Sequence, residues 1–186
     1  RNFTSQRPQT VVEQVRQGHA VPAQIICVLN DISYNVKLVD AGLVTVILEH
    51  LEHAQEDINA YMLLKPGGGG SDLLFLPSAW LNVLDNLMHP QGLPPSHLVR
   101  VRKQIAKQFH ADSPVTMCMT TTHQQDLEFF GSETIWISCL TIYMSLLSNL
   151  VLSEPAKVIL EKRPGAICRF LVRMSFLDDT SRMAAV

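Results

Sequence analysis

Apolar residues recur every three or four positions along most of this chain, which is the period of an amphipathic α-helix. In residues 43–55, Val44, Ile47, Leu48 and Leu51 fall on one helical face and the charged residues fall on the other. The strict alternation of apolar and polar residues that is typical of β-strands is almost absent. The pattern therefore predicts an all-α fold.

Glycine, proline and serine divide this pattern into separate segments. The predicted helices cover residues 10–17, 23–32, 34–41, 43–55, 57–65, 79–88, 97–110, a long stretch within 126–153, 155–161 and 166–177. Gly18 and Gly42 follow predicted helices, where glycine readily adopts the left-handed backbone that ends them. Ser78 and Ser96 are expected as N-caps, and the aperiodic residues 111–125 are expected as a loop.

The predicted helix over residues 135–152 contains no charged residue. Its length is close to that of a membrane span. However, it carries several hydroxyl side chains and Asn149, and it lacks a basic flank. We therefore expect a buried helix in the middle of a helical stack, with a membrane-anchored adaptor as an alternative.

The chain has 186 residues and a formal charge of −2, and its charged fraction of 17% is below the roughly 25% of an average soluble domain. This composition excludes a disordered tail and a strongly basic nucleic-acid binder. The length fits one domain or a piece of a larger array. Because the chain begins at Arg1, we expect the natural N-terminus to lie elsewhere.

Four cysteines occur without a CxxC pair or any other metal-ligand spacing. We expect reduced thiols, mostly in the core. The first 18 residues are polar and lack the apolar run of a secretory signal. The sequence thus predicts a cytosolic or nuclear protein.

Gly67, Gly68, Gly69, Gly70 and Ser71 form a run that is typical of a flexible engineered linker. We expect it to replace a loop or to tether two polypeptides. It divides the chain into a first helical segment (1–66), the linker (67–71) and a second helical segment (72–186).

Two stretches of the chain share one order of elements. In residues 28–51 and 146–174, an apolar helix ends in an asparagine, a short helix runs to a glycine, and another apolar helix begins at once. A looser copy covers residues 84–99. A glycine between two helices permits a sharp turn, and one such unit must stack on neighbours to bury its apolar face.

This order resembles the armadillo repeat, in which a short helix and two longer helices stack into a right-handed superhelix. The resemblance covers roughly half of the chain and implies an armadillo-like alpha-solenoid fragment with irregular repeats. Gly42, Gly92 and Gly165 are 50 and 73 residues apart, against a family period of about 42. HEAT-like or other alpha-solenoid repeats stay open.

The resemblance also implies a binding groove. Asn30, Asn86 and Asn149 would end the third helix of each unit and bond the backbone of an extended partner peptide. The tryptophan that nuclear-transport members place four residues earlier is replaced by Ile26, Asn82 and Ser145, so recognition of nuclear localisation signals is not expected. The alternative is that each asparagine closes its helix or bonds a neighbouring loop.

A second candidate surface is basic. Arg100, Lys103 and Lys107 follow a helical spacing of three and four residues, and Arg102 adds a fourth cation. This face would bind an acidic partner segment or phosphate. The alternative is a solvated outer face.

Catalytic, metal and cofactor motifs give no positive signal. His50 and His53 are three residues apart, but the sequence offers no matching third ligand and no HExxH motif. It also lacks a GxSxG motif and a P-loop. We therefore expect a non-enzymatic scaffold without a cofactor, metal or small-molecule substrate.

The sequence as a whole predicts a helical-repeat fragment of a larger protein that binds a peptide or helix of another protein through a groove or a helical face. One alternative is a nucleic-acid-associated subunit that uses the basic helix 97–110. The other is the membrane-anchored adaptor that uses residues 135–152.

Overall fold

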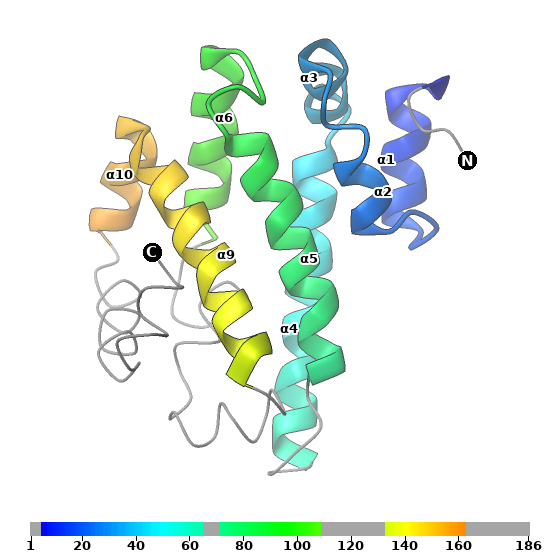
Figure 1. Cartoon of the computed structure of the whole chain (residues 1–186), viewed down its shortest axis with the longest axis vertical. Helices are drawn as coiled ribbons and strands as arrows, with labels where there is room; N and C mark the ends of the chain where they lie inside the picture. The colour runs from blue at the N-terminus through cyan, green and yellow to red at the C-terminus, as the bar shows by residue number, and fades with distance from the viewer. Residues whose placement is uncertain (1–4, 65–70, 109–132, 163–186) are drawn as a thin grey trace.

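The computed structural model describes residues 5–64, 71–108 and 133–162, and within these ranges the regular structure is helical with no β-strand (Figure 1). This confirms the all-α prediction. The helices are α1 (Pro8–Arg16), α2 (Pro22–Ile26), α3 (Ile32–Asp40), α4 (Leu43–Leu64), α5 (Ser71–Met88), α6 (Pro95–Ala106), α9 (Glu133–Val151) and α10 (Glu154–Glu161).

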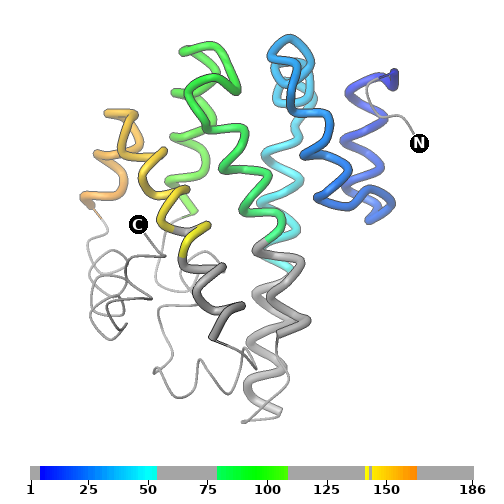
Figure 2. Tube along the Cα trace, in the orientation of Figure 1, coloured from blue at the N-terminus to red at the C-terminus, as the bar shows by residue number. Residues whose placement is uncertain are grey.

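Three helices form a row, because α5 packs against α2 on one side and against α9 on the other (Figure 1). Helix α4 lies behind α5 and also contacts α1. The shorter helices α3, α6 and α10 lie at one end of this arrangement, where α6 contacts α5, α9 and α10. The trace in Figure 2 shows how each turn at this end leads from one helix into the next.

The core lies between the row and the helices behind it. The four apolar residues predicted to share a face in 43–51 are all buried, as are Leu84 and Leu87 of α5. The buried apolar residues of α1, α3, α4, α5, α6, α9 and α10 belong to one continuous cluster. Each short helix is therefore held by tertiary packing, because isolated helices of this length are marginal in water.

Two predicted helix ends are confirmed by the backbone. Gly18 and Gly42 have φ angles of 71° and 98°, a region that residues with a Cβ atom enter only at a cost. Gly42 lies in the two-residue turn between α3 and α4.

The helix predicted over residues 23–32 is wrong, because α2 ends at Ile26 and residues 27–30 form turns. The cause is Asp31, whose extended backbone (φ −112°, ψ 108°) and side chain cap the next helix. Its Oδ1 atom accepts hydrogen bonds from the backbone N–H groups of Ser33 (2.9 Å) and Tyr34 (3.4 Å). An aspartate in this position starts a helix and cannot continue one.

Other predicted boundaries also differ. Ser78 lies inside α5 and does not cap it, and the separate helices predicted over 43–55 and 57–65 are one helix, α4. Ser96 lies within α6, whose N-cap is Pro94. Ser71 is the first residue of α5, whereas residues 67–70, the predicted loop 111–125 and the predicted helix 166–177 lie outside the described ranges.

Helix α9 covers most of the uncharged segment 135–152. None of the described helices, α9 included, combines the length and apolar character that crossing a bilayer requires.

A buried asparagine joins the first two turns at the end of the row. Asn35 is 1% exposed, and its Nδ2 atom donates to the carbonyl oxygens of Leu29 (2.9 Å) and Gly92 (3.0 Å). The first carbonyl belongs to the turn between α2 and α3, and the second belongs to the turn between α5 and α6. One side chain thus fixes the spacing of these two turns.

The turn that contains Gly92 has no space for a side chain. A Cβ atom on Gly92 would lie 2.7 Å from the carbonyl oxygen of Asn86 and 3.0 Å from that of Leu87, whereas a Cβ atom on Gly18 would meet nothing within 4 Å. The two glycines are therefore needed for different reasons, close packing at Gly92 and a left-handed backbone at Gly18.

We expect Gly92→Ala to lower the free energy of unfolding by about 2–3 kcal/mol, because backbone atoms must move to admit the methyl group. Gly18→Ala should cost about 1 kcal/mol, since it adds only left-handed strain. Urea denaturation of both variants measures the difference. An effect of Gly92→Ala no larger than that of Gly18→Ala would contradict this account of the turn.

Candidate functional site

The three asparagines predicted to line a groove all lie near the carboxyl ends of the helices in the row. Asn30 lies in the turn after α2, Asn86 lies two residues before the end of α5, and Asn149 lies in the last turn of α9. Asn30 and Asn86 are exposed, whereas Asn149 is half-buried. Asn30 does not end a long helix as expected, because α2 has only five residues.

The amide groups of the two exposed asparagines make local bonds. Asn86 Nδ2 donates to the Asn82 carbonyl oxygen at 2.8 Å and lies 3.1 Å from Asn82 Oδ1. Asn30 Nδ2 donates to the Cys27 carbonyl oxygen at 3.4 Å. Both side chains stay at the surface, where amides can exchange such bonds for bonds to a partner.

Asn149 has a different environment, because it binds a carboxylate on the neighbouring helix. Its Nδ2 atom donates to Asp85 Oδ1 at 2.8 Å, and the Ser145 hydroxyl donates to Asp85 Oδ2 at 2.7 Å. Hydrogen bonds to an ionised acceptor are stronger than neutral ones. Asp85 therefore links α5 to α9 through two bonds, and the sequence analysis did not identify it as a site residue.

We use the name amide face for the polar residues that lie in the second half of α5 and of α9 and in the turn after α2: Asn30, Asn82, Asp85, Asn86, Ser145 and Asn149. Asn35 connects the turn that contains Asn30 with the turn that follows Asn86, because it donates to the carbonyl oxygens of Leu29 and Gly92. Amide and hydroxyl groups dominate the amide face, and Asp85 supplies its negative charge.

The predicted basic face is only partly formed. Arg100 makes an ion pair with Asp40 of α3, and His97 Nε2 lies 3.5 Å from the same carboxylate. The hydrogen bond from Arg100 is the main reason that the pKa of Asp40 lies below its usual value, and the charges of Arg100 and His97 act in the same direction. Arg100 thus helps to hold α6 against α3.

Arg102 is buried, with 6% of its surface exposed, so its assignment to an exposed basic face is wrong. Its Nη2 atom donates to the Met88 carbonyl oxygen at 2.8 Å, and burial lowers the pKa of its guanidinium. Met88 is the last residue of α5. A cation at the carboxyl end of a helix stabilises the unpaired carbonyl groups there.

Lys103 and Lys107 are exposed, as predicted. Lys103 borders a pocket of about 430 Å³ between α6 and α10, together with Glu154, Pro155, Val158 and Ile159. Lys107 is the C-cap residue of α6. The surface that the helix presents therefore carries three cations and not four.

The two histidines considered as metal ligands have other roles. His50 Nε2 lies 2.7 Å from the Val15 carbonyl oxygen, and its ring stacks on Trp80 with 5.8 Å between centroids and 5° between planes. His53 Nδ1 lies 2.7 Å from the Glu49 carbonyl oxygen. Within the described ranges, histidine, cysteine, aspartate and glutamate form no group of three that could hold a metal.

Ser96, His97 and Asp40 are of the residue types that form a proton relay in hydrolases. The Ser96 Oγ to His97 Nδ1 distance is 3.4 Å, and the His97 Nε2 to Asp40 distance is 3.5 Å. Both distances are long for a relay, and Asp40 binds Arg100 as its main partner. These distances do not support a catalytic role for Ser96, His97 and Asp40.

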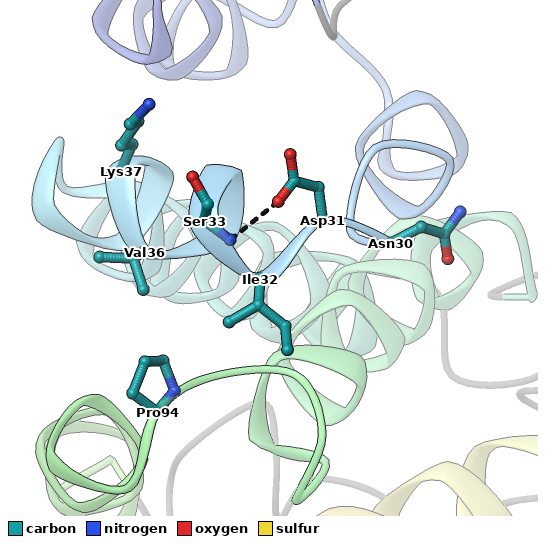
Figure 3. A pocket seen from close by; sticks show the side chains of 7 residues that line it. All are labelled: Asn30, Asp31, Ile32, Ser33, Val36, Lys37 and Pro94. Atoms are coloured by element: carbon teal, nitrogen blue, oxygen red, sulfur yellow. Dashed lines mark hydrogen bonds between the residues drawn. The ribbon is translucent and has the colours of Figure 1, made fainter.

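A larger pocket lies beside Asn30, on the outer side of α3. It has a volume of about 790 Å³, and its lining residues are Asn30, Asp31, Ile32, Ser33, Val36, Lys37 and Pro94. In Figure 3, Ile32, Val36 and Pro94 approach one another below α3, while Asp31, Ser33 and Lys37 lie above it. We call this pocket the α3 slot. Cys27, one of four thiols that were expected mostly in the core, is exposed.

No protein-family model, no curated protein and no solved structure matches this chain.

We expect Asp85→Ala to lower the free energy of unfolding by about 1–3 kcal/mol, because the Ser145 hydroxyl and the Asn149 amide lose their acceptor in a half-buried site. Asn86→Ala, next to it but exposed, should change stability by less than about 0.5 kcal/mol. Chemical denaturation of both variants tests the link between α5 and α9. Equal effects of the two substitutions would show that Asp85 does not clamp these helices.

The lowered pKa of Asp40 predicts how the stability of the folded state depends on pH. Because the carboxylate is favoured in the folded state, its contribution to stability is present above the unfolded pKa near 3.8 and is lost as the pH falls through the lower folded value. A carboxyl NMR titration should show a raised Asp40 pKa in Arg100→Ala and a smaller rise in His97→Ala. An unchanged pKa in Arg100→Ala would contradict the assigned cause.

Proposed function

We propose that this chain is part of a helical scaffold that binds a segment of another protein, and that it performs no catalysis. The proposal rests mainly on one observation: Asn30, Asn86 and Asn149 lie near the carboxyl ends of three helices that pack in one row. Side chains that recur near the carboxyl ends of adjacent helices can bond successive parts of one partner chain.

An armadillo-like alpha-solenoid is the organisation that we propose for this scaffold. Each of Asn30 and Asn149 is followed by a short helix, α3 or α10, and Asn86 is followed by α6. The row of α2, α5 and α9 supports this proposal, because stacked repeats place their corresponding helices side by side. Further repeats would continue the row on either side.

The amide face suits the backbone of an extended peptide. An asparagine side chain both donates and accepts hydrogen bonds, so it can bond a peptide group whatever the partner's side chains are. Asp85 adds one negative charge between α5 and α9. Hydrogen bonds between the partner and this face replace bonds to water, so each contributes only a modest net free energy of binding. Apolar contacts next to the face must therefore supply most of the affinity.

Nucleic-acid binding through α6, which overlaps the basic helix predicted over residues 97–110, is the second proposal. It is less favoured because Arg102 is buried and Arg100 is paired with Asp40. Fewer available cations mean fewer phosphate contacts and a weaker dependence on salt. For either proposal, the expected location of the protein is the cytosol or the nucleus.

Site-specific photo-crosslinking tests the amide face. A photoreactive amino acid at position 86 should crosslink a defined protein from nuclease-treated cell lysate, whereas one at position 52, exposed on α4, should not. Asn30→Ala should reduce the yield at position 86, because it removes an adjacent amide. Mass spectrometry of the adducts gives the readout.

Three outcomes would contradict the proposal. The same products at both positions would indicate nonspecific contact. Products that disappear after nuclease treatment would favour the nucleic-acid function. If Asn30→Ala left the crosslinking yield at position 86 unchanged, Asn30 and Asn86 would not bind the same partner segment, and the amide face would not act as one site.

A further inference from the structure

On α5 and α9, the hydrogen-bond donors of the amide face are used inside the protein. Asn86 Nδ2 bonds the carbonyl oxygen and the Oδ1 atom of Asn82. The Ser145 hydroxyl and Asn149 Nδ2 both donate to Asp85. Because a carbonyl oxygen and a carboxylate can only accept hydrogen bonds, these contacts also fix which end of the Asn86 and Asn149 amides faces inward.

The groups that remain for a partner are mainly acceptors. Among the described residues, none donates to the Oδ1 atom of Asn86 or of Asn149. Each oxygen of Asp85 accepts one bond, and a carboxylate oxygen has two lone pairs, so each can accept one more. Asn86 is exposed, and Asp85 and Asn149 are half-buried. This part of the amide face therefore suits a partner group that supplies donors.

The charges of the row favour a cation at the same place. Helices α2, α5 and α9 contain no lysine, arginine or histidine, whereas α5 and α9 carry Asp72, Asp85 and Glu133. Within the part of the chain that the structure describes, no cation pairs with Asp85. Arg102 bonds the last carbonyl group of α5 but is itself buried. The carboxyl end of a helix also carries a partial negative charge, and neither α5 nor α9 has a basic residue in its last turn.

We propose that the amide face binds an arginine side chain of the partner segment between α5 and α9. A guanidinium group has five N–H donors and no acceptor, so it can pair with Asp85 while it donates to the side-chain oxygen of Asn86 or Asn149. An ammonium group has fewer donors and no planar fork. This inference rests on the scaffold function, because it names the chemistry of the partner at the same site.

The test is selection from a random peptide library displayed on phage, with the full 186-residue chain as target and its Ser148→Lys variant as counter-target. Ser148 is exposed on α9, one turn after Ser145, and is not part of the contact with Asp85. We expect enriched peptides that share an arginine and bind the variant less well. An acidic or uncharged consensus, the absence of enriched peptides, or equal binding to both targets would overturn the proposal.

Fluorescence anisotropy with a synthetic copy of the selected peptide gives the magnitudes. Ser148→Lys should weaken binding about fivefold or more, and Ser148→Glu should strengthen it about twofold. Gln9→Lys and Gln9→Glu make the same charge changes on the exposed side of α1 and should stay within about 1.5-fold because salt screens distant charges. Equal effects at positions 9 and 148 would indicate attraction by net charge alone and overturn the assigned site. Circular dichroism spectra check that the variants remain folded.

Two changes in the peptide separate the charge of the guanidinium from its shape. Citrulline in place of the arginine keeps the shape and removes the charge, so binding should fall about tenfold or more. Lysine keeps the charge and loses the fork, so binding should fall about threefold or more. A citrulline or lysine peptide that binds as tightly as the arginine peptide would overturn the assignment.

The results also distinguish this inference from the scaffold function on which it rests. A defined protein crosslinked at position 86, together with no arginine preference among the peptides, would overturn the arginine site and keep the scaffold. Arginine-dependent binding that responds to Ser148→Lys, together with no specific crosslink at position 86, would support the arginine site and contradict the proposed scaffold function.

Discussion

The end of the helical row depends on one buried amide. Asn35 is almost fully buried, and its Nδ2 atom is shared between the carbonyl oxygens of Leu29 and Gly92. Without it, one carbonyl group in each of these two turns would lose its partner beside a buried side chain, which is costly. The position of α3 relative to the turn before α6 follows from this side chain, and so does the α3 slot.

The same kind of contact recurs between other helices of this chain. Arg102 binds the last carbonyl group of α5, and His50 lies within hydrogen-bond distance of the Val15 carbonyl oxygen near the end of α1. In these cases a side chain from one helix bonds the main chain at the carboxyl end of another. Such contacts satisfy carbonyl groups that a helix leaves unpaired, and they also fix the crossing point of the two helices.

The sequence predicted the features that depend on local patterns. The buried face of residues 43–51 and the helix-ending glycines Gly18 and Gly42 are confirmed, because periodicity and backbone preference are local properties. The sequence did not predict the burial of Arg102, since its charge suggested solvent and its partner is a distant carbonyl group. It also missed Asp85, whose two donors lie 60 and 64 residues further along the chain.

Contacts from a side chain to the main chain place few demands on the sequence of the segment that they bond. Every residue has a carbonyl group, so Asn35 and Arg102 need a helix end at the right place but no particular residue there. The Asp85 contact requires both Ser145 and Asn149, and the ion pair between α6 and α3 likewise requires both Arg100 and Asp40. The α5–α9 junction is therefore specific to its residues, whereas the Asn35 and Arg102 contacts depend on where a carbonyl group lies.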